Sequence, residues 1–313
     1  MIRLAHFLRE AIANLAMNVP AIRKWRVKSG RTVLEGVLSD QVHLILSQFD
    51  FFIEAIGWDR VRGKTVIEIG PGDAIPHAFL FLAAGAKRYL AIDRFLGNAS
   101  GPLAMDLYDG LIKSAPERIK GGWNAMGLAA LNSLGPRSIL QGAQVEIAAQ
   151  SIEELNIRQF ALGDVIISFN VIEHLSNVSR AFANMAQLLN PDGLMIHRVD
   201  YGPHDLWRTY QNPLTFLTAS NTLWSLMGSH RGYANRKRHS QVLSALGKAG
   251  FQSAARITGR FSMEKVKAIR PFLCEEFRDL TDEDLQIADA EIVSGLVVPP
   301  SLGGHVFGHN PVR

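Results

Sequence analysis

The chain has 313 residues, of which 47% are hydrophobic and 20% are charged, a composition that excludes a globally disordered protein. Its 33 basic and 29 acidic residues leave a formal charge of +4, a surplus too small to indicate nucleic-acid binding by itself. The one cysteine, Cys274, cannot form an internal disulfide, so a reducing cytoplasm is the expected location.

Residues 1–60 are predicted to form a helical N-terminal extension ahead of the sheet. Leu4, Leu8, Ile12 and Leu15 recur near one helical face, and a basic run follows over 23–28. A helix packed on the protein's own surface is the favoured interpretation, and peripheral membrane contact through this helix is the alternative. No stretch approaches the roughly 18 to 20 apolar residues needed to span a bilayer.

From Lys64 onward, short apolar runs alternate with helical patterns, which predicts a parallel α/β sheet. We expect a helix over 178–190 because its apolar residues recur at helical spacing before the run NPDG. The expected strands are 65–69, 89–93, 144–148, 164–168, 194–199, 251–259 and 290–298.

Two stretches, 97–142 and 200–250, are longer than short connections between strands and helices require. We therefore divide the chain into the extension over 1–60 and one domain over 61–313 that carries these two insertions.

A carboxylate and two glycines mark the end of the first expected strand, in the run VIEIGPGD over 66–73. Gly70 and Gly72 lack the β-carbons that would keep a ligand away from the backbone at this sheet edge. Asp93 ends the next strand, where a nucleoside site places the acid that binds ribose hydroxyls. Glu68 favours a cationic amino group over a pyrophosphate, which it would repel.

These runs resemble the class I S-adenosylmethionine-dependent methyltransferases over roughly residues 60–200, with weaker support to about residue 298. EIGPGDA over 68–74 is similar to their first motif, with Ala74 at the third glycine, and Asp93 in AIDRF is similar to their second. The runs over 163–175 and 185–199 are similar to their fourth-strand region and to the helix and strand that follow it. The resemblance implies a Rossmann-like, mostly parallel seven-stranded sheet with an antiparallel final strand, helices on both faces, and S-adenosyl-L-methionine as cofactor.

The resemblance also implies where the cofactor lies. The two glycines line its methionine part, Asp93 holds the ribose hydroxyls, and Asn170 lies near the sulfonium. Gln150 and Ser151 are candidate adenine contacts, with capping of the following turn as the alternative. The cofactor-binding candidates are Glu68, Gly70, Gly72, Asp73, Asp93, Arg94, Gln150, Ser151 and Asn170.

The acceptor is expected beside the segment HRVDYGPHD, which covers the end of the fifth strand, with His197 inside it, and the residues just beyond. A histidine that titrates near neutrality suits the removal of a proton from a hydroxyl. His204 is the first candidate for this base and His174 the second, and Asp200 is expected to orient or bind the substrate. In the alternative interpretation these groups hold the loop in place by hydrogen bonds.

Some relatives carry Glu-x-x-Glu-His after the fourth strand and bind a divalent metal there. This chain keeps Glu173 and His174 but has Asn170 at the first position. The loss of one anionic ligand weakens a site for a hard cation, so no metal site is expected. The basic run 235–239 could clamp a phosphate or carboxylate of the acceptor, or begin a solvated helix.

The favoured function is methyl transfer from S-adenosylmethionine to an oxygen of a small metabolite or saccharide, with a nitrogen as second choice. A small-molecule acceptor is therefore the expected partner. An RNA methyltransferase is disfavoured because the basic residues form no stripe along the sequence. A non-catalytic subunit that binds the cofactor is the remaining alternative, and the sequence does not indicate an oligomeric state.

Overall fold

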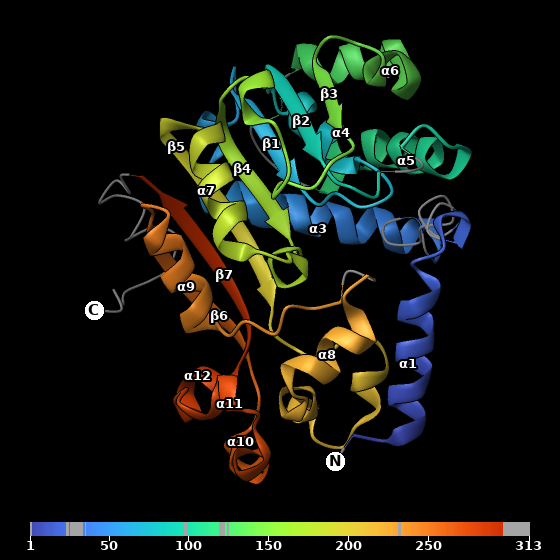
Figure 1. Cartoon of the computed structure of the whole chain (residues 1–313). Helices are drawn as coiled ribbons and strands as arrows, with labels where there is room; N and C mark the ends of the chain where they lie inside the picture. The colour runs from blue at the N-terminus through green and yellow to red at the C-terminus, as the bar shows by residue number, and fades with distance from the viewer. Residues whose placement is uncertain are drawn as a thin grey trace.

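A computed structural model describes residues 2–22, 25, 34, 36–96, 99–118, 123, 125–230 and 233–296. Seven strands form one sheet in the order β3-β2-β1-β4-β5-β7-β6 (Figure 1). Six strands run in one direction, and β7 lies antiparallel to both of its neighbours, which confirms the predicted sheet. The strands are β1 (Thr65–Ile69), β2 (Arg88–Ile92), β3 (Val145–Ala148), β4 (Gly163–Phe169), β5 (Leu189–Asp200), β6 (Gln252–Arg260) and β7 (Ile287–Gly295).

Helices cover both faces of the sheet, as expected (Figure 1). The α-helices are α1 (Leu4–Ala16), α3 (Leu38–Ile56), α4 (Pro76–Ala83), α5 (Pro102–Arg118), α6 (Ala125–Leu140), α7 (Val178–Leu188), α8 (Asn221–Gly228), α9 (His239–Lys248), α10 (Met263–Ile269), α11 (Glu275–Arg278) and α12 (Asp282–Gln286). The short 3₁₀ segments are η1 (Trp58–Arg60), η2 (Ile157–Gln159), η3 (Ile172–His174), η4 (Asp205–Thr209), η5 (Pro213–Thr218) and η6 (Arg270–Phe272). Within the described residues, no helix combines the length and the apolar character needed to cross a membrane.

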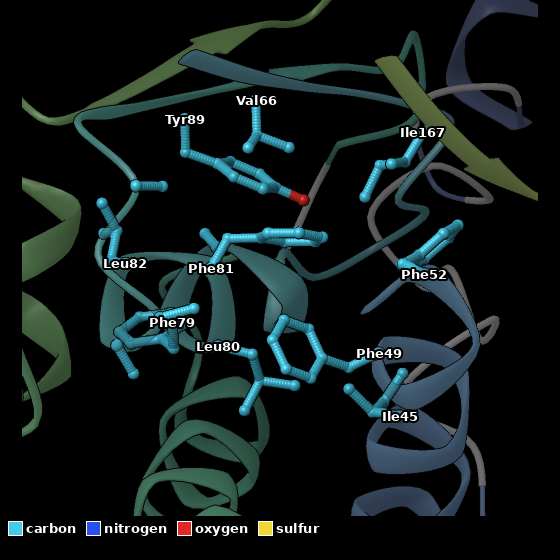
Figure 2. Packing of buried hydrophobic residues seen from close by; sticks show 14 of the residues in the cluster. Ile45, Phe49, Phe52, Val66, Phe79, Leu80, Phe81, Leu82, Tyr89 and Ile167 are labelled. Carbon is cyan, nitrogen blue, oxygen red and sulfur yellow. The ribbon is translucent and has the colours of Figure 1, made fainter. Parts of the chain in front are cut away.

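An aromatic core lies between one face of the sheet and helices α3, α4 and α5. Figure 2 shows Phe49 and Phe52 of α3 beside Phe81 of α4, with Val66 and Tyr89 reaching down from the sheet. These five side chains are buried. Strand side chains alternate between the two faces, so Glu68, two residues after Val66, points into the same layer.

The second core lies on the opposite face of the sheet, beneath α7 and α9. The predicted helix over 178–190 ends at Leu188, because the chain already pairs with β4 at Leu189, opposite Gly163. The last strand is also displaced from the prediction: it spans Ile287–Gly295 rather than 290–298. Here α12, whose N-terminus Thr281 caps, leads directly into the strand.

Residues 1–60 contribute to the packing of the rest of the chain. Helix α3 supplies part of the aromatic core, and α1 packs against α8. The stretch 97–142 contains α5 and α6, and 200–250 contains η4, η5, α8 and α9. The division at residue 60 stays a prediction.

Candidate functional site

The turn after β1 has the backbone geometry that its glycines predicted. Gly70 and Gly72 have φ angles of 72° and 85°, which side chains other than glycine disfavour. The N–H of Gly70 donates to the carbonyl of Ile92 at 2.9 Å. Asp93 accepts from the N–H of Gly72 at 2.8 Å and from that of Phe95 at 2.6 Å. The structure thus brings Gly70, Gly72 and Asp93 together at the carboxyl ends of β1 and β2.

Glu68 lies beneath this turn in a buried polar cluster. Its Oε1 is 2.7 Å from Nδ1 of His77 on α4, and its Oε2 accepts from the Tyr89 hydroxyl. Burial raises the pKa of Tyr89 well above its ordinary value, and the negative charge of Glu68 raises it further by a smaller amount. Contact of Glu68 with the charged end of the cofactor stays a prediction, and its visible role is to support the turn from below. The sequence analysis missed His77 and Tyr89, although strand alternation points Glu68 toward α4.

Asp73 follows the glycines and is buried, and its charge contributes to a raised pKa of Tyr108, after the larger effect of burial. The Tyr108 hydroxyl accepts from the N–H of Ile75 at 3.0 Å and donates to the carbonyl of Ala99 at 3.0 Å. Tyr108 therefore holds the entry to α4 against α5, and contact of Asp73 with the cofactor stays a prediction.

The remaining cofactor candidates near β2 and β3 lie closer to solvent. Arg94 is exposed, and its guanidinium lies 4.5 Å from the ring centre of Phe95. Gln150 is exposed, whereas the hydroxyl of half-buried Ser151 donates to Glu153 at 2.5 Å. Ser151 thus makes the turn interaction that the sequence analysis weighed as an alternative. Its contact with adenine, like that of Gln150, stays a prediction.

Asn170 connects the glycine turn to the acceptor side. Its φ of 56° lies in the left-handed region, and its N–H donates to the carbonyl of Arg198 on β5 at 2.9 Å. The next residue, Val171, packs so closely on Gly70 that an added β-carbon there would lie 2.5 Å from its side chain. The loop after β4 therefore rests directly on the first turn.

The three acceptor-side candidates converge at the carboxyl ends of β4 and β5. The rings of His174 and His204 are 4.9 Å apart between centres and meet edge to face. Nε2 of His204 lies 3.9 Å from Oδ2 of Asp200, whose Oδ1 accepts from the N–H of Gly202 at 2.6 Å. His204 and Asp200 are about one-fifth exposed, at 18% and 21% of their side chains. Both side chains are therefore partly exposed, whereas the Nε2 atom of His204 is itself buried.

Glu173 is buried beside these groups. Burial raises the pKa of its carboxyl group well above the ordinary value, and the charge of Asp200 adds to this rise. The backbone N–H groups of Glu173 and Asp200 favour the charged form, with a smaller effect than burial. Ligand atoms of Glu173, His174 and His204 lie within 4.8 Å of one another, so these three residues could hold a metal ion. The expectation that no metal is required stays a prediction.

The basic run 235–239 leads into a helix as one interpretation expected, since α9 begins at His239, but its two arginines are buried and bonded within the protein rather than solvated or free to clamp an anion. The guanidinium of buried Arg236 donates to the carbonyls of Phe216 and Ala219, at 3.3 and 2.5 Å. That of Arg238, also buried, donates to the carbonyl of Tyr201 at 2.5 Å and to those of Leu285 and Ile287. These arginines tie the insertion to the sheet and form no exposed clamp.

Asn235, at the start of the same run, fixes the loop that carries the acceptor-side candidates. Its side-chain amide donates to the carbonyls of Ile172 and Leu175 at 2.7 and 2.9 Å. Its backbone N–H donates to the carbonyl of Glu173 at 2.6 Å. The second insertion therefore encloses the segment after β4, a contact between distant parts of the chain that local sequence patterns do not contain.

Comparison with known proteins identifies a family for most of this region. The family model described as "Methyltransferase domain" matches residues 46–253, which is more than half of the chain. An S-adenosylmethionine-dependent methyltransferase from Mesorhizobium loti is similar at 15% identity and a TM-score of 0.41, over 80% of this chain and 97% of that one. The YcgJ protein from Bacillus subtilis is similar at 14% identity and a TM-score of 0.40, over 80% and 97%. No curated protein matches the chain.

Proposed function

The chain belongs to the S-adenosylmethionine-dependent methyltransferases, and we propose that it methylates a hydroxyl oxygen of a small metabolite or saccharide. S-adenosyl-L-methionine is its cofactor and supplies an electrophilic methyl group on a positively charged sulfur. The glycine turn with Asp93 is the part of the structure that fits this cofactor, because it offers close backbone approach and a carboxylate.

The observation that carries the proposal is the pair formed by His204 and Asp200. A hydroxyl acceptor must lose a proton when it gains a methyl group, and an imidazole suits this role near neutral pH. The Asp200 carboxylate, 3.9 Å from Nε2 of His204, favours the imidazolium that proton uptake creates. His174, whose ring lies against that of His204, stands at the same place and is the second candidate for the base.

A further carboxylate lies beside Asp200. Asp289 of β7 lies opposite Asp200 of β5 in the antiparallel register. Burial raises the pKa of Asp289, and the Asp200 charge raises it further. This concentration of acidic groups supports a histidine base, since it stabilises a protonated imidazole.

The buried arginines of 235–239 support a small acceptor over RNA. Arg236 and Arg238 are bonded to backbone carbonyls, and Lys237 pairs with Glu276 at 2.8 Å. Binding of RNA phosphates depends on accessible, unpaired cations; the two arginines are buried, and Lys237, 40% exposed, is paired with a carboxylate.

The test is a product assay on the intact protein. Binding of S-adenosylmethionine is first measured by calorimetry, and release of S-adenosylhomocysteine is then followed with panels of hydroxyl metabolites, amines and RNA. We expect turnover with a hydroxyl compound and a loss of about 10²- to 10⁴-fold in His204→Ala, with cofactor affinity unchanged. His43→Ala, a change at an exposed histidine of α3, is the matched control.

Two results would overturn parts of the proposal. Turnover confined to amines would reject the hydroxyl acceptor, and turnover confined to RNA would reject the small-molecule acceptor. Full turnover in His204→Ala with normal acceptor binding would remove His204 as the base and move the role to His174.

A further inference from the structure

Helix α1 packs against the protein with its polar side and leaves its apolar side uncovered. His6, Glu10 and Asn14 are buried, whereas Leu4, Leu8, Ile12 and Leu15 are 71%, 48%, 66% and 65% exposed. With 3.6 residues per turn, the positions in each set lie on one face of the helix, and the two faces are roughly opposite. We call the four exposed residues the outer face of α1. An ordinary surface helix has the reverse arrangement.

Hydrogen bonds from the buried side hold α1 in this orientation. The Asn14 amide donates to the carbonyls of Ser225 and Leu226 on α8, at 3.2 and 3.0 Å, and its oxygen accepts from the N–H of His230 at 2.8 Å. At the other end of the helix, Nδ1 of His6 is 3.0 Å from the Tyr210 hydroxyl. Rotation of α1 to bury its leucines would break these bonds.

Other large apolar side chains in the residues after α1 and on α8 are also exposed. Val19, Ile22 and Trp25, which follow α1, are 46%, 40% and 69% exposed. Leu226 of α8, beside the Asn14 contact, is 51% exposed. Four large apolar residues exposed on one helical face mark an interaction surface more often than an isolated one does.

The exposed charged residues of α1, and those that follow it in the sequence, are basic. Among residues 2–22, the exposed charged side chains are Arg3 and Arg9, and the acidic Glu10 is buried. In the sequence, residues 23–31 carry five basic residues and no acidic one. An exposed apolar row with basic residues near it in the sequence is complementary to a layer of anionic headgroups above hydrocarbon.

We propose that the outer face of α1 binds the surface of an anionic lipid bilayer. The helix lies in the plane of the interface, with its leucines and isoleucine in the boundary between headgroups and acyl chains. Arg9 is the exposed cation of α1 that can meet the lipid phosphates, since the Arg3 guanidinium is bonded to Thr209. Exposed Trp25 suits the headgroup level. The buried polar side keeps its bonds to α8, so the catalytic domain is held at the membrane without a change of fold.

The experiment is co-sedimentation of the full chain with vesicles. The vesicles are pure phosphatidylcholine, or phosphatidylcholine with about 30% phosphatidylserine. We expect binding to the anionic vesicles, a weakening with added salt, and a loss of about ten-fold or more in the double variant Leu8→Asp/Ile12→Asp. Leu134→Asp, which places the same charge on a 59% exposed leucine of α6, is the matched control and should bind normally.

Unchanged affinity for S-adenosylmethionine in calorimetry shows that each variant is folded. Three outcomes would overturn the proposal: no sedimentation with either vesicle, equal binding by the double variant, or equal binding to neutral and anionic vesicles. A dimer in light scattering that the double variant abolishes, without vesicle binding, would also overturn it and assign the face to a second copy of the chain.

Discussion

Asp93 at the end of β2 accepts a hydrogen bond from the backbone N–H of Gly72, and this 2.8 Å contact links the two turns expected to hold the cofactor. One carboxylate thus serves the loop after β1 and the loop after β2. Burial raises its pKa, while the N–H groups of Phe95 and Gly72 lower it. Its other oxygen, bonded to Phe95, fixes its orientation.

Replacement of Asp93 by alanine should weaken binding of S-adenosylmethionine about 10- to 100-fold, the usual effect of losing a hydrogen bond to a charged group. Asp93→Asn keeps an oxygen acceptor for the N–H of Gly72 and should lose less affinity for the cofactor. Calorimetric titration measures both, and Asp59→Ala, at a surface carboxylate whose side chain is 96% exposed, is the control. Unchanged affinity in Asp93→Ala would remove this residue from the cofactor site.

Treatment with EDTA should leave turnover largely intact. Glu173 is the one carboxylate of the Glu173, His174 and His204 group, and Asn170 occupies the position of the second acid. A hard divalent cation prefers more anionic oxygen ligands than this. Metal content by mass spectrometry and turnover before and after chelation provide the measurement. Activity that EDTA abolishes and a divalent ion restores would show that the group is a metal site.

Acidification should destabilise the protein through its buried histidines. His197 of β5 is buried and bonded to the Ser168 hydroxyl at 2.7 Å, and burial lowers its pKa to about 3. As pH falls below about 6.5, His197 takes up a proton in the unfolded chain, whereas in the folded protein it stays neutral until about pH 3. The free energy of unfolding should therefore fall by up to about 1.4 kcal/mol per pH unit for this residue. His239, with a pKa of about 4, acts in the same direction.

Urea denaturation between neutral and mildly acidic pH measures this slope. His197→Gln should make the dependence on pH shallower, whatever its effect at neutral pH, because the side chain no longer titrates. His43→Gln, at an exposed position, should leave the slope unchanged. Identical slopes for the wild-type protein and His197→Gln would contradict the prediction.

Loss of the buried Arg238 side chain should cost about 3 kcal/mol of unfolding free energy. Its guanidinium binds the carbonyls of Tyr201, Leu285 and Ile287, which alanine would leave without this donor. Thermal and urea unfolding of Arg238→Ala, against the exposed Arg158→Ala, measure the effect. A variant as stable as the control would show that water replaces the guanidinium at little cost.

The sequence predicted those features that depend on neighbouring residues in the chain. Strand periodicity located the sheet, and the spacing of Gly70, Gly72 and Asp93 located the turns that the structure joins. The partners of Glu68 were not predictable in the same way, because His77 and Tyr89 reach it only once α4 and β2 are placed. Residue type gave no sign that Arg238 would be buried, since arginine is seldom buried without partners.

Helix α1 shows a second limit of prediction from the sequence. Periodicity identifies an apolar stripe, but it does not say which stripe faces the protein. In this helix the side with His6 and Asn14 is buried, because Tyr210 and the carbonyls of α8 offer partners there. Those partners lie more than 200 positions away in the chain.

The inward side of α1 also determines how its role can be studied. The His6 ring lies 4.5 Å from that of Trp207, which is only 1% exposed. Deletion of the helix would expose this tryptophan together with Tyr210. A new exposed aromatic surface would then replace the outer face of α1. A chain without α1 could then bind vesicles through these aromatic residues. Point substitutions on an intact helix therefore test the role of the leucines more directly than deletion does.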